Sequence, residues 1–294
     1  MTLTLSFKSG TFKSAEEVLN FMMRHLHFMP VAISSPWSFS GGYHDFNREE
    51  ALEKFRNNND TTFTIADDFY LYADEKNKIM YREDSYKYVQ YFIFDFQKLD
   101  NTWLKSLIEE AHSIGFFMGY LTDEIKSIWQ SQEFLNHYTQ TGRSFSHLNF
   151  KMHWHPILSP IVKNEIIDIF YNPGHSIMTY NTWLMAAPEM WFSKDSWEYF
   201  NKEKIKSFKE AIEINEWQDD LLYVKLFDAT ADDYESKEIL SLQSQFRELS
   251  EMNKIEKELE EICNKKNESK PKDTLIKTIN YTPTIETKRD VSEN

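Results

Sequence analysis

Residues 165–208, EIIDIFYNPGHSIMTYNTWLMAAPEMWFSKDSWEYFNKEKIKSF, are the apolar, aromatic stretch around which the chain is organised. Residues 166–170 predict a buried strand, and residues 176–180 predict a second strand that pairs with it in a hairpin. Asn172-Pro173-Gly174 predicts the turn between them, because proline presets its backbone angle and glycine accepts a positive φ.

The rest of this stretch indicates a scaffold. Residues 183–192 are apolar but too few and too interrupted to cross a membrane. Ser193 is expected to cap a short helix that follows it. The stretch has neither a nucleophile beside a base nor a glycine-rich cradle, so we expect it to serve binding.

Composition excludes several classes of function. The chain has 47 acidic and 33 basic residues and a net charge of −14, which repels nucleic-acid phosphates and anionic lipid. We therefore expect no direct nucleic-acid partner and no membrane partner. Seven glycines argue against phosphate-binding loops, and the lone Cys263 excludes a disulfide framework. The chain shows neither a signal-peptide pattern nor a run of about 20 apolar residues, so we expect a soluble, cytoplasmic protein.

The order of elements predicts an α+β fold, a mostly antiparallel sheet covered by helices. Alternating apolar residues predict a strand at 2–7, and Ser14 with Glu17 forms the capping-box pattern that starts a helix. The predicted helices of this part lie at 15–27, 48–56 and 101–113, and the predicted strands at 61–66, 69–73, 78–82, 86–96 and 116–121.

After residue 124 the sequence predicts a helix over 125–138, a strand over 221–227 and a long C-terminal helix over 236–264. Apolar residues recur in that last helix every three or four positions and form one narrow stripe. The interpretation is an α+β half over 1–138, a second α+β half over 139–264, and a polar, weakly ordered tail over 265–294.

Few residues suggest chemistry. His147, His153 and His155 cluster in sequence without a nearby carboxylate, so ordinary polar contacts are the favoured interpretation. Adjacent acid pairs are expected by frequency in so acidic a chain, and Gly41-Gly42 is more typical of a turn than of a phosphate loop. We expect no enzyme, no cofactor and no metal site.

The acidic residues concentrate between 210 and 261, where 16 acidic and 5 basic residues give a local net charge of −11. One interpretation is a solvated helix face. The other is a surface that captures a cationic groove, since opposite charges speed association. The candidate contact residues are Asp219, Asp220, Asp232, Asp233 and Glu235, with Trp217 or Tyr234 as an aromatic anchor.

The central stretch resembles bacterial immunity proteins of contact-dependent and type VI secretion (Rhs-type) toxin systems. The resemblance lies in the P-x-M-W-F-x-x-x-x-W-x-Y run at 188–199, the K-x-x-I-x-x-F run at 202–208, and the helix start at 14–17. These segments cover about a quarter of the chain. The resemblance implies a non-enzymatic protein that binds one cognate toxin domain and occludes its active site. If that toxin acts on nucleic acid or nucleotides, we expect its substrate groove to be basic, so that an acidic surface would compete with the substrate.

Two other classes remain open. One is a mobile-element enzyme with an unrecognised active site, for which a bound metal or a cleft of paired acids would be the evidence. The other is an adaptor that assembles through the helix at 236–264. Loss of an oligomer when Leu242, Leu249 and Leu259 become polar would support it.

Overall fold

The structure is a computed structural model, and it describes residues 1–34, 44–57, 69–154 and 163–268. The glycine pair at 41–42, the strand predicted at 61–66, His155 and the tail from residue 269 onward lie outside the described residues.

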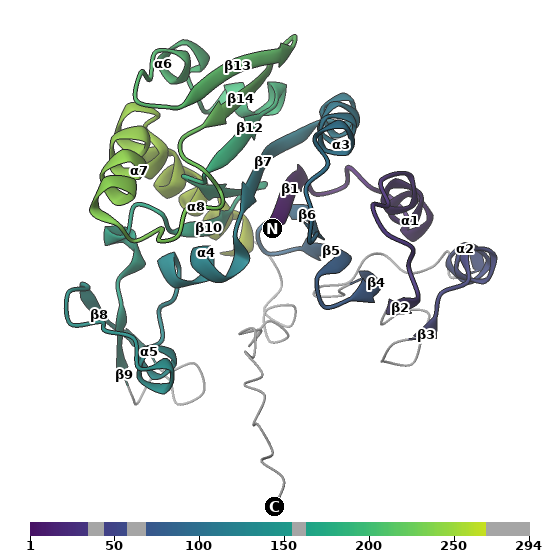
Figure 1. The fold of residues 1–294 in the computed structure, drawn as a ribbon, viewed down its shortest axis with the longest axis horizontal. Coiled ribbons are helices and arrows are strands. Elements are labelled where there is room, and N and C mark those ends of the chain that lie inside the picture. The colour runs from purple at the N-terminus through teal and green to yellow at the C-terminus, as the bar shows by residue number, and fades with distance from the viewer. Residues whose placement is uncertain (35–43, 58–68, 155–162, 269–294) are drawn as a thin grey trace, which may run out of the picture.

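One antiparallel sheet of ten strands forms the centre of the molecule (Figure 1). Its strands, in spatial order, are β13 (Glu213–Gln218), β14 (Leu221–Lys225), β12 (Glu189–Phe192), β7 (Phe116–Thr122), β1 (Thr2–Lys8), β6 (Val89–Asp95), β5 (Asn77–Asp84), β4 (Phe69–Asp74), β2 (Ala32–Ser34) and β3 (His44–Asp45). The predicted α+β class is confirmed.

Eight α-helices and two short 3₁₀ turns lie in the described ranges. The helices are α1 (Ala15–Arg24), α2 (Arg48–Asn57), α3 (Asn101–Ile114), α4 (Glu124–Gln130), α5 (Leu135–Thr141), α6 (Lys202–Lys206), α7 (Lys237–Leu249) and α8 (Met252–Glu268), and the 3₁₀ turns are Ile169–Tyr171 and Lys194–Glu198. Ser14 caps α1 as predicted, because its side chain accepts the N–H of Glu17.

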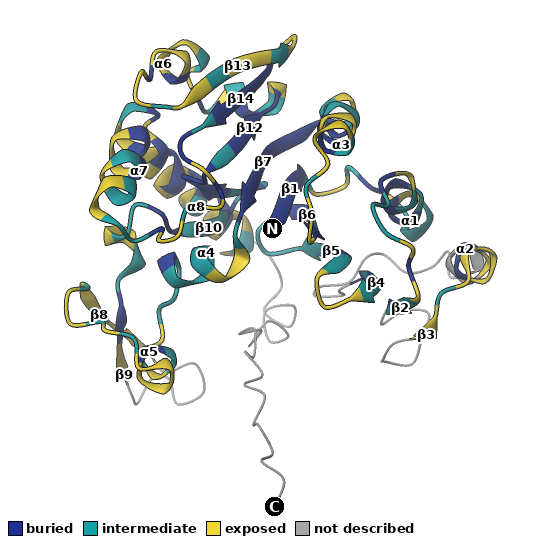
Figure 2. Ribbon diagram, viewed as in Figure 1, coloured by how far each residue is buried: buried dark blue, intermediate teal, exposed yellow. Residues whose placement is uncertain are grey.

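The two faces of the sheet bury two separate cores, and side chains that alternate along a strand enter opposite ones. On β12, Trp191 belongs to the core that includes residues of α1 and α3, whereas Met190 and Phe192 belong to the core that includes residues of α6, α7 and α8. Figure 2 shows the central strands buried between these helices. The aromatic run at 188–192 is therefore scaffold.

Two small sheets accompany the large one, and they correct the predicted hairpin. β8 (Phe150–Trp154) pairs with β9 (Lys163–Ile167), and β10 (Ser176–Thr179) pairs with β11 (Thr182–Met185). The strand predicted at 166–170 thus does not pair with the one at 176–180. The chain leaves β9 at Asp168, which caps a 3₁₀ turn, and β10 reverses through Asn181 at φ 63°.

Ser193 is the N-cap residue of the short 3₁₀ turn Lys194–Glu198, as predicted, but its side chain does not make the capping contact. The Ser193 side chain makes no hydrogen bond to the following turn; its Oγ lies 2.8 Å from Nδ1 of His112. Ser193 is fully buried, so its hydroxyl joins the turn after β12 to α3.

The two long helices predicted over 125–138 and 236–264 are both interrupted. The helix predicted over 125–138 divides at Ser131, whose hydroxyl accepts the N–H of Ser176. The helix predicted over 236–264 divides where Glu251 adopts a φ of 59°, which separates α7 from α8. The stripe of α7 and α8 packs into the core beneath them, and Leu259 is completely buried. The predicted boundary at 138/139 lies within α5, and the large sheet takes strands from both sides of it.

Candidate functional site

The seven candidate contact residues lie at two separate places. Trp217 lies near the end of β13, and Asp219 and Asp220 form the turn to β14. The other four, Asp232, Asp233, Tyr234 and Glu235, lie between β14 and α7. The two groups leave opposite ends of β14, a five-residue strand that spans about 16 Å at the usual rise per residue. They do not form one continuous patch along this strand.

The β13–β14 turn is fastened to the body of the protein. Asp220 adopts a φ of 64°, its carbonyl accepts the indole N–H of Trp197 at 3.0 Å, and its carboxylate lies 3.1 Å from Nζ of Lys202. Trp217 is half-buried, with its ring 5.8 Å from that of Trp191. Trp217 thus packs mainly within the protein's own core.

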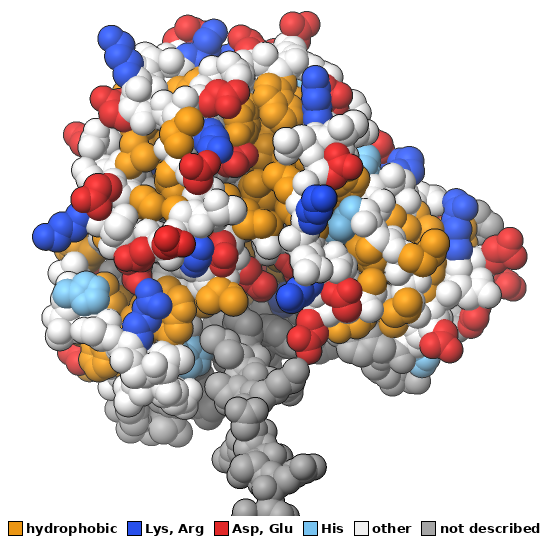
Figure 3. Space-filling view, viewed as in Figure 1, with side chains coloured by type: hydrophobic (Ala, Val, Ile, Leu, Met, Phe, Trp, Pro, Cys, Tyr) orange, Lys and Arg blue, Asp and Glu red, His pale blue; other side chains and the backbone are white. Residues whose placement is uncertain are grey.

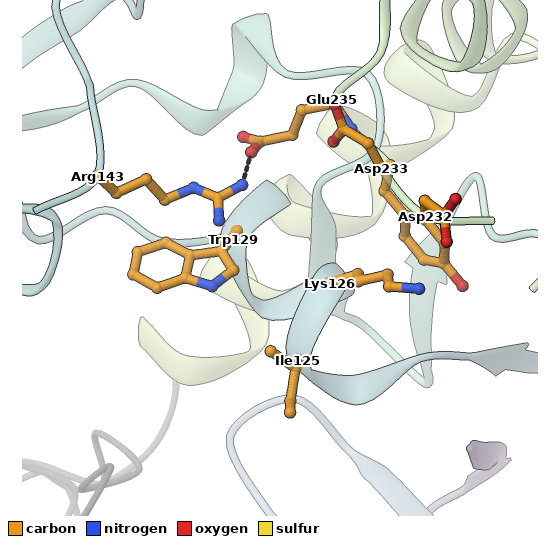
Figure 4. Close-up of a pocket in the computed structure, with 8 residues that line it drawn as sticks. Ile125, Lys126, Trp129, Arg143, Asp232, Asp233 and Glu235 are labelled. Carbon is orange, nitrogen blue, oxygen red and sulfur yellow. Dashed lines mark hydrogen bonds and ion pairs between the residues drawn. The ribbon is translucent and has the colours of Figure 1, made fainter. Parts of the chain in front are cut away.

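The second group lines a pocket of about 370 Å³ (Figure 4). Its remaining walls come from α4 and from a residue that follows α5. The lining residues are Ile125, Lys126, Trp129, Arg143, Asp232, Asp233, Tyr234 and Glu235. Four of the seven candidates are therefore brought together in one hollow.

Hydrogen bonds hold the acidic segment 232–235 against α4. Nζ of Lys126 donates to the carbonyl of Ala231 at 2.6 Å, and the hydroxyl of Tyr234 accepts the N–H of Asp123, which caps α4. Tyr234 is only 1% exposed, and burial raises the pKa of its hydroxyl. Tyr234, predicted as a partner-binding anchor, is thus buried, and its ring fixes this segment to the fold.

Arg143 borders the pocket beside Glu235, the last residue of the acidic segment. Its guanidinium forms an ion pair with Glu235 and lies 4.7 Å from the centre of the Trp129 ring. Figure 4 shows both contacts side by side. Carboxylate pairing and stacking on an aromatic ring are the two interactions that suit a guanidinium. The pocket wall thus already binds one guanidinium through an aromatic ring and a carboxylate.

The pocket has an excess of negative charge. Glu235 is paired with Arg143, and Lys126 lies 3.6 Å from Asp123. Within the described part of the chain, Asp232 and Asp233 have no cationic nitrogen within 4.0 Å, and both are exposed. Their two carboxylates are available to an incoming cation.

A buried polar cluster lies elsewhere on α7 and α8, at the turn that precedes β10. Glu256 accepts from Arg247 and lies 3.1 Å from Nε2 of His175, and all three side chains are 1% exposed. Burial lowers the pKa of Arg247, against the attraction of Glu256. Because the cluster has no access to solvent, it joins secondary-structure elements and does not offer a surface for a ligand.

The other candidates show no convergence. His147 and His153 are exposed, and Sγ of the buried Cys263 lies 2.8 Å from the carbonyl of Tyr86. Within the described ranges, no three His, Cys, Asp or Glu side chains are arranged to bind a metal ion, and no helix there is long and apolar enough to span a membrane.

Comparison with protein-family models, curated proteins and solved structures found no match to this chain.

Proposed function

We propose that this chain is an immunity protein that binds a cognate antibacterial toxin domain and occludes its active site without catalysing a reaction. The observation that supports it best is the pocket of α4 and residues 232–235. Two exposed carboxylates, which have no cationic partner among the described residues, line it together with the ring of Trp129. A basic substrate groove on the toxin would be attracted to this surface.

The residues that carry the resemblance, 188–208, form part of the scaffold beneath this binding surface. Met190, Trp191 and Phe192 are completely buried in the two cores of the sheet, so they position the surface and are not themselves its contact residues. The proposed contacts are Asp232, Asp233 and Trp129, with Glu235 fixing Arg143 beside them.

The proposal is tested by co-expressing the chain in bacteria with toxin domains taken from secreted polymorphic toxins of the same genome. We expect it to restore growth against one of them, and the purified pair to form a stable complex. If none of the toxins is bound or neutralised, the proposed function is wrong.

Two matched double variants then locate the contact. Asp232→Lys with Asp233→Lys should slow association about tenfold, as expected when steering charges are reversed. Asp219→Lys with Asp220→Lys changes the net charge equally at the other end of β14, so it should leave the association rate nearly unchanged. If both double variants slow association equally, or if neither slows it at low salt, the pocket is not the contact surface.

A further inference from the structure

Exposed apolar side chains gather on one projecting part of the molecule, beside the pocket. This arm comprises residues 134–154 and 163–171, with α5, β8, β9 and the first 3₁₀ turn, and it extends from the body in Figure 1. Its exposed large apolar side chains are Phe134, Phe150, Met152, Phe170 and Tyr171, from 39% to 69% exposed. Figure 3 shows apolar side chains at the surface there, among histidine and lysine side chains.

The arm and the pocket are physically continuous. The ring of Trp129 in the pocket lies 5.0 Å from the ring of Tyr138, which lies 6.0 Å from Phe145, which in turn lies 6.5 Å from Phe150. Arg143 lies over the ring of Trp129, at one end of this series of rings, and pairs with Glu235. The packed interior of the arm, in which Tyr138 is only 2% exposed, therefore begins at the wall of the acidic pocket.

The arm has little charge of its own. Its described residues include three basic and two acidic side chains. Lys151 lies 3.4 Å from Glu133 and 3.2 Å from Asp168, and it covers the ring of Phe170 at 5.1 Å. A nearly neutral apolar surface thus adjoins the two carboxylates of Asp232 and Asp233 that have no cationic partner in the described chain.

We infer that pocket and arm form one docking surface for a partner segment in which arginine or lysine alternates with apolar side chains. The inference rests on the proposed function and specifies the partner's chemistry. The cation would enter beside Asp232, Asp233 and Trp129, while the apolar neighbours lie along β8. A second copy of this chain fits poorly, because two bodies of net charge −14 repel each other.

The test uses two fluorescein-labelled peptides, Arg-Phe-Arg-Phe-Arg and Arg-Ser-Arg-Ser-Arg, and fluorescence anisotropy with the full chain. We expect the phenylalanine peptide to bind about tenfold more tightly, a difference that buried apolar area readily supplies. Asp232→Lys with Asp233→Lys should weaken both peptides about tenfold, as expected when two attractive charges become repulsive. Asp219→Lys with Asp220→Lys should leave both affinities within about twofold, although the net charge changes equally.

The apolar part of the docking surface, on the arm, is tested separately. Met152→Ser with Tyr171→Ser should lower the affinity of the phenylalanine peptide to that of the serine peptide. Met29→Ser with Ile212→Ser is the control, because these side chains are 82% and 60% exposed outside the arm. All four side chains are exposed, so folding is preserved and circular dichroism should be unchanged.

Three results would overturn the docking surface. They are equal weakening by both aspartate pairs, no effect of the arm variant, and a dimer in sedimentation velocity that the arm variant dissociates. If the peptides discriminate as expected but no toxin is neutralised, only the proposed function fails. If a toxin is neutralised but the peptides do not discriminate, only the docking surface fails.

Discussion

Gly174 shows how one residue can be predicted for the wrong reason. The sequence predicts glycine there to supply a positive φ in a turn. The turn exists, but Gly174 is not among the glycines with positive φ. Instead, a Cβ at this position would overlap the side-chain amide of Gln130. Gln130 is completely buried and its amide donates to Tyr234 O and to Gln243 Oε1, so the position requires the absence of a side chain.

Gly174→Ala should therefore destabilise the protein by about 1–3 kcal/mol, as overpacking of a dense interior does. Urea unfolding at neutral pH measures the loss. In a Gln130→Ala background, which removes the overlapping amide, the same substitution should cost much less. An equal cost in both backgrounds would show that backbone conformation, and not the contact with Gln130, requires the glycine.

Two histidines at the end of α1 should make stability depend on pH. Burial lowers the pKa of His25 below its usual 6.5, although Glu110, 2.9 Å away, opposes this. Burial also lowers the pKa of His27, against its hydrogen bond to Asp95 O. Above pH 6.5 both rings are neutral in the folded and unfolded chain. As the pH falls below 6.5, the unfolded chain binds protons first, so stability decreases.

Urea midpoints between pH 7.5 and 5.5 test this. The wild-type midpoint should fall with pH, and His25→Gln with His27→Gln should reduce the slope, whatever the absolute stability of the variant. His153→Gln, at an exposed position on β8, is the control and should leave the slope unchanged. If the double variant keeps the wild-type slope, the pH dependence does not arise from His25 and His27.

For helices and strands, local sequence patterns predicted where several elements occur better than they predicted which strands pair. The strands β1, β4, β5, β6 and β7 were predicted, because each presents apolar side chains to a core, whereas the short strands β2 and β3 were not. The hairpin predicted over 166–180 is wrong, because the choice of partner strand depends on contacts distant in sequence, such as the hydrogen bond from the N–H of Asp168 to Asn149 O. The break between α7 and α8 gives no periodicity signal, because the apolar stripe continues across Glu251.

The buried cluster of Arg247, Glu256 and His175 fastens α7, α8 and the turn before β10 together. Glu256→Gln should destabilise the chain by about 3–5 kcal/mol, because it leaves the Arg247 charge buried without its counter-ion. Replacing both partners, Arg247→Met with Glu256→Leu, should restore much of that loss. Chemical unfolding measures both. As a control, Glu109→Gln at the exposed Lys105 pair should change the midpoint little.

At the scale of the whole molecule, composition identified the acidic half of the candidate site and could not identify the rest. Asp232, Asp233 and Glu235 belong to a visible excess of acidic residues. Trp129 and Arg143 carry no such signal, since Arg143 meets Glu235 across 92 residues of sequence and only the folded chain closes the pocket. The same limit explains Tyr234, whose burial no local pattern indicates.

The division of the chain at residue 138 can be tested through the sheet that crosses it. β7 lies between β1 and β12, and its side chains enter both cores, Phe116 on one face and Phe117 on the other. Because the two cores share this strand, loss of one should weaken the other. We expect the full chain to unfold in one transition, with coincident curves by tryptophan fluorescence and far-ultraviolet circular dichroism.

A fragment of residues 1–138 lacks β12 and the helices that cover Phe117 and Tyr120. It should therefore expose the face of β7 that carries Phe117 and the unpaired edge of β7 that binds β12 in the full chain. We expect it to aggregate, or to unfold without a cooperative transition. The contrary result would be a soluble fragment that unfolds cooperatively at the midpoint of the full chain. In that case the first core would be self-sufficient, and the shared sheet would join two independently stable units.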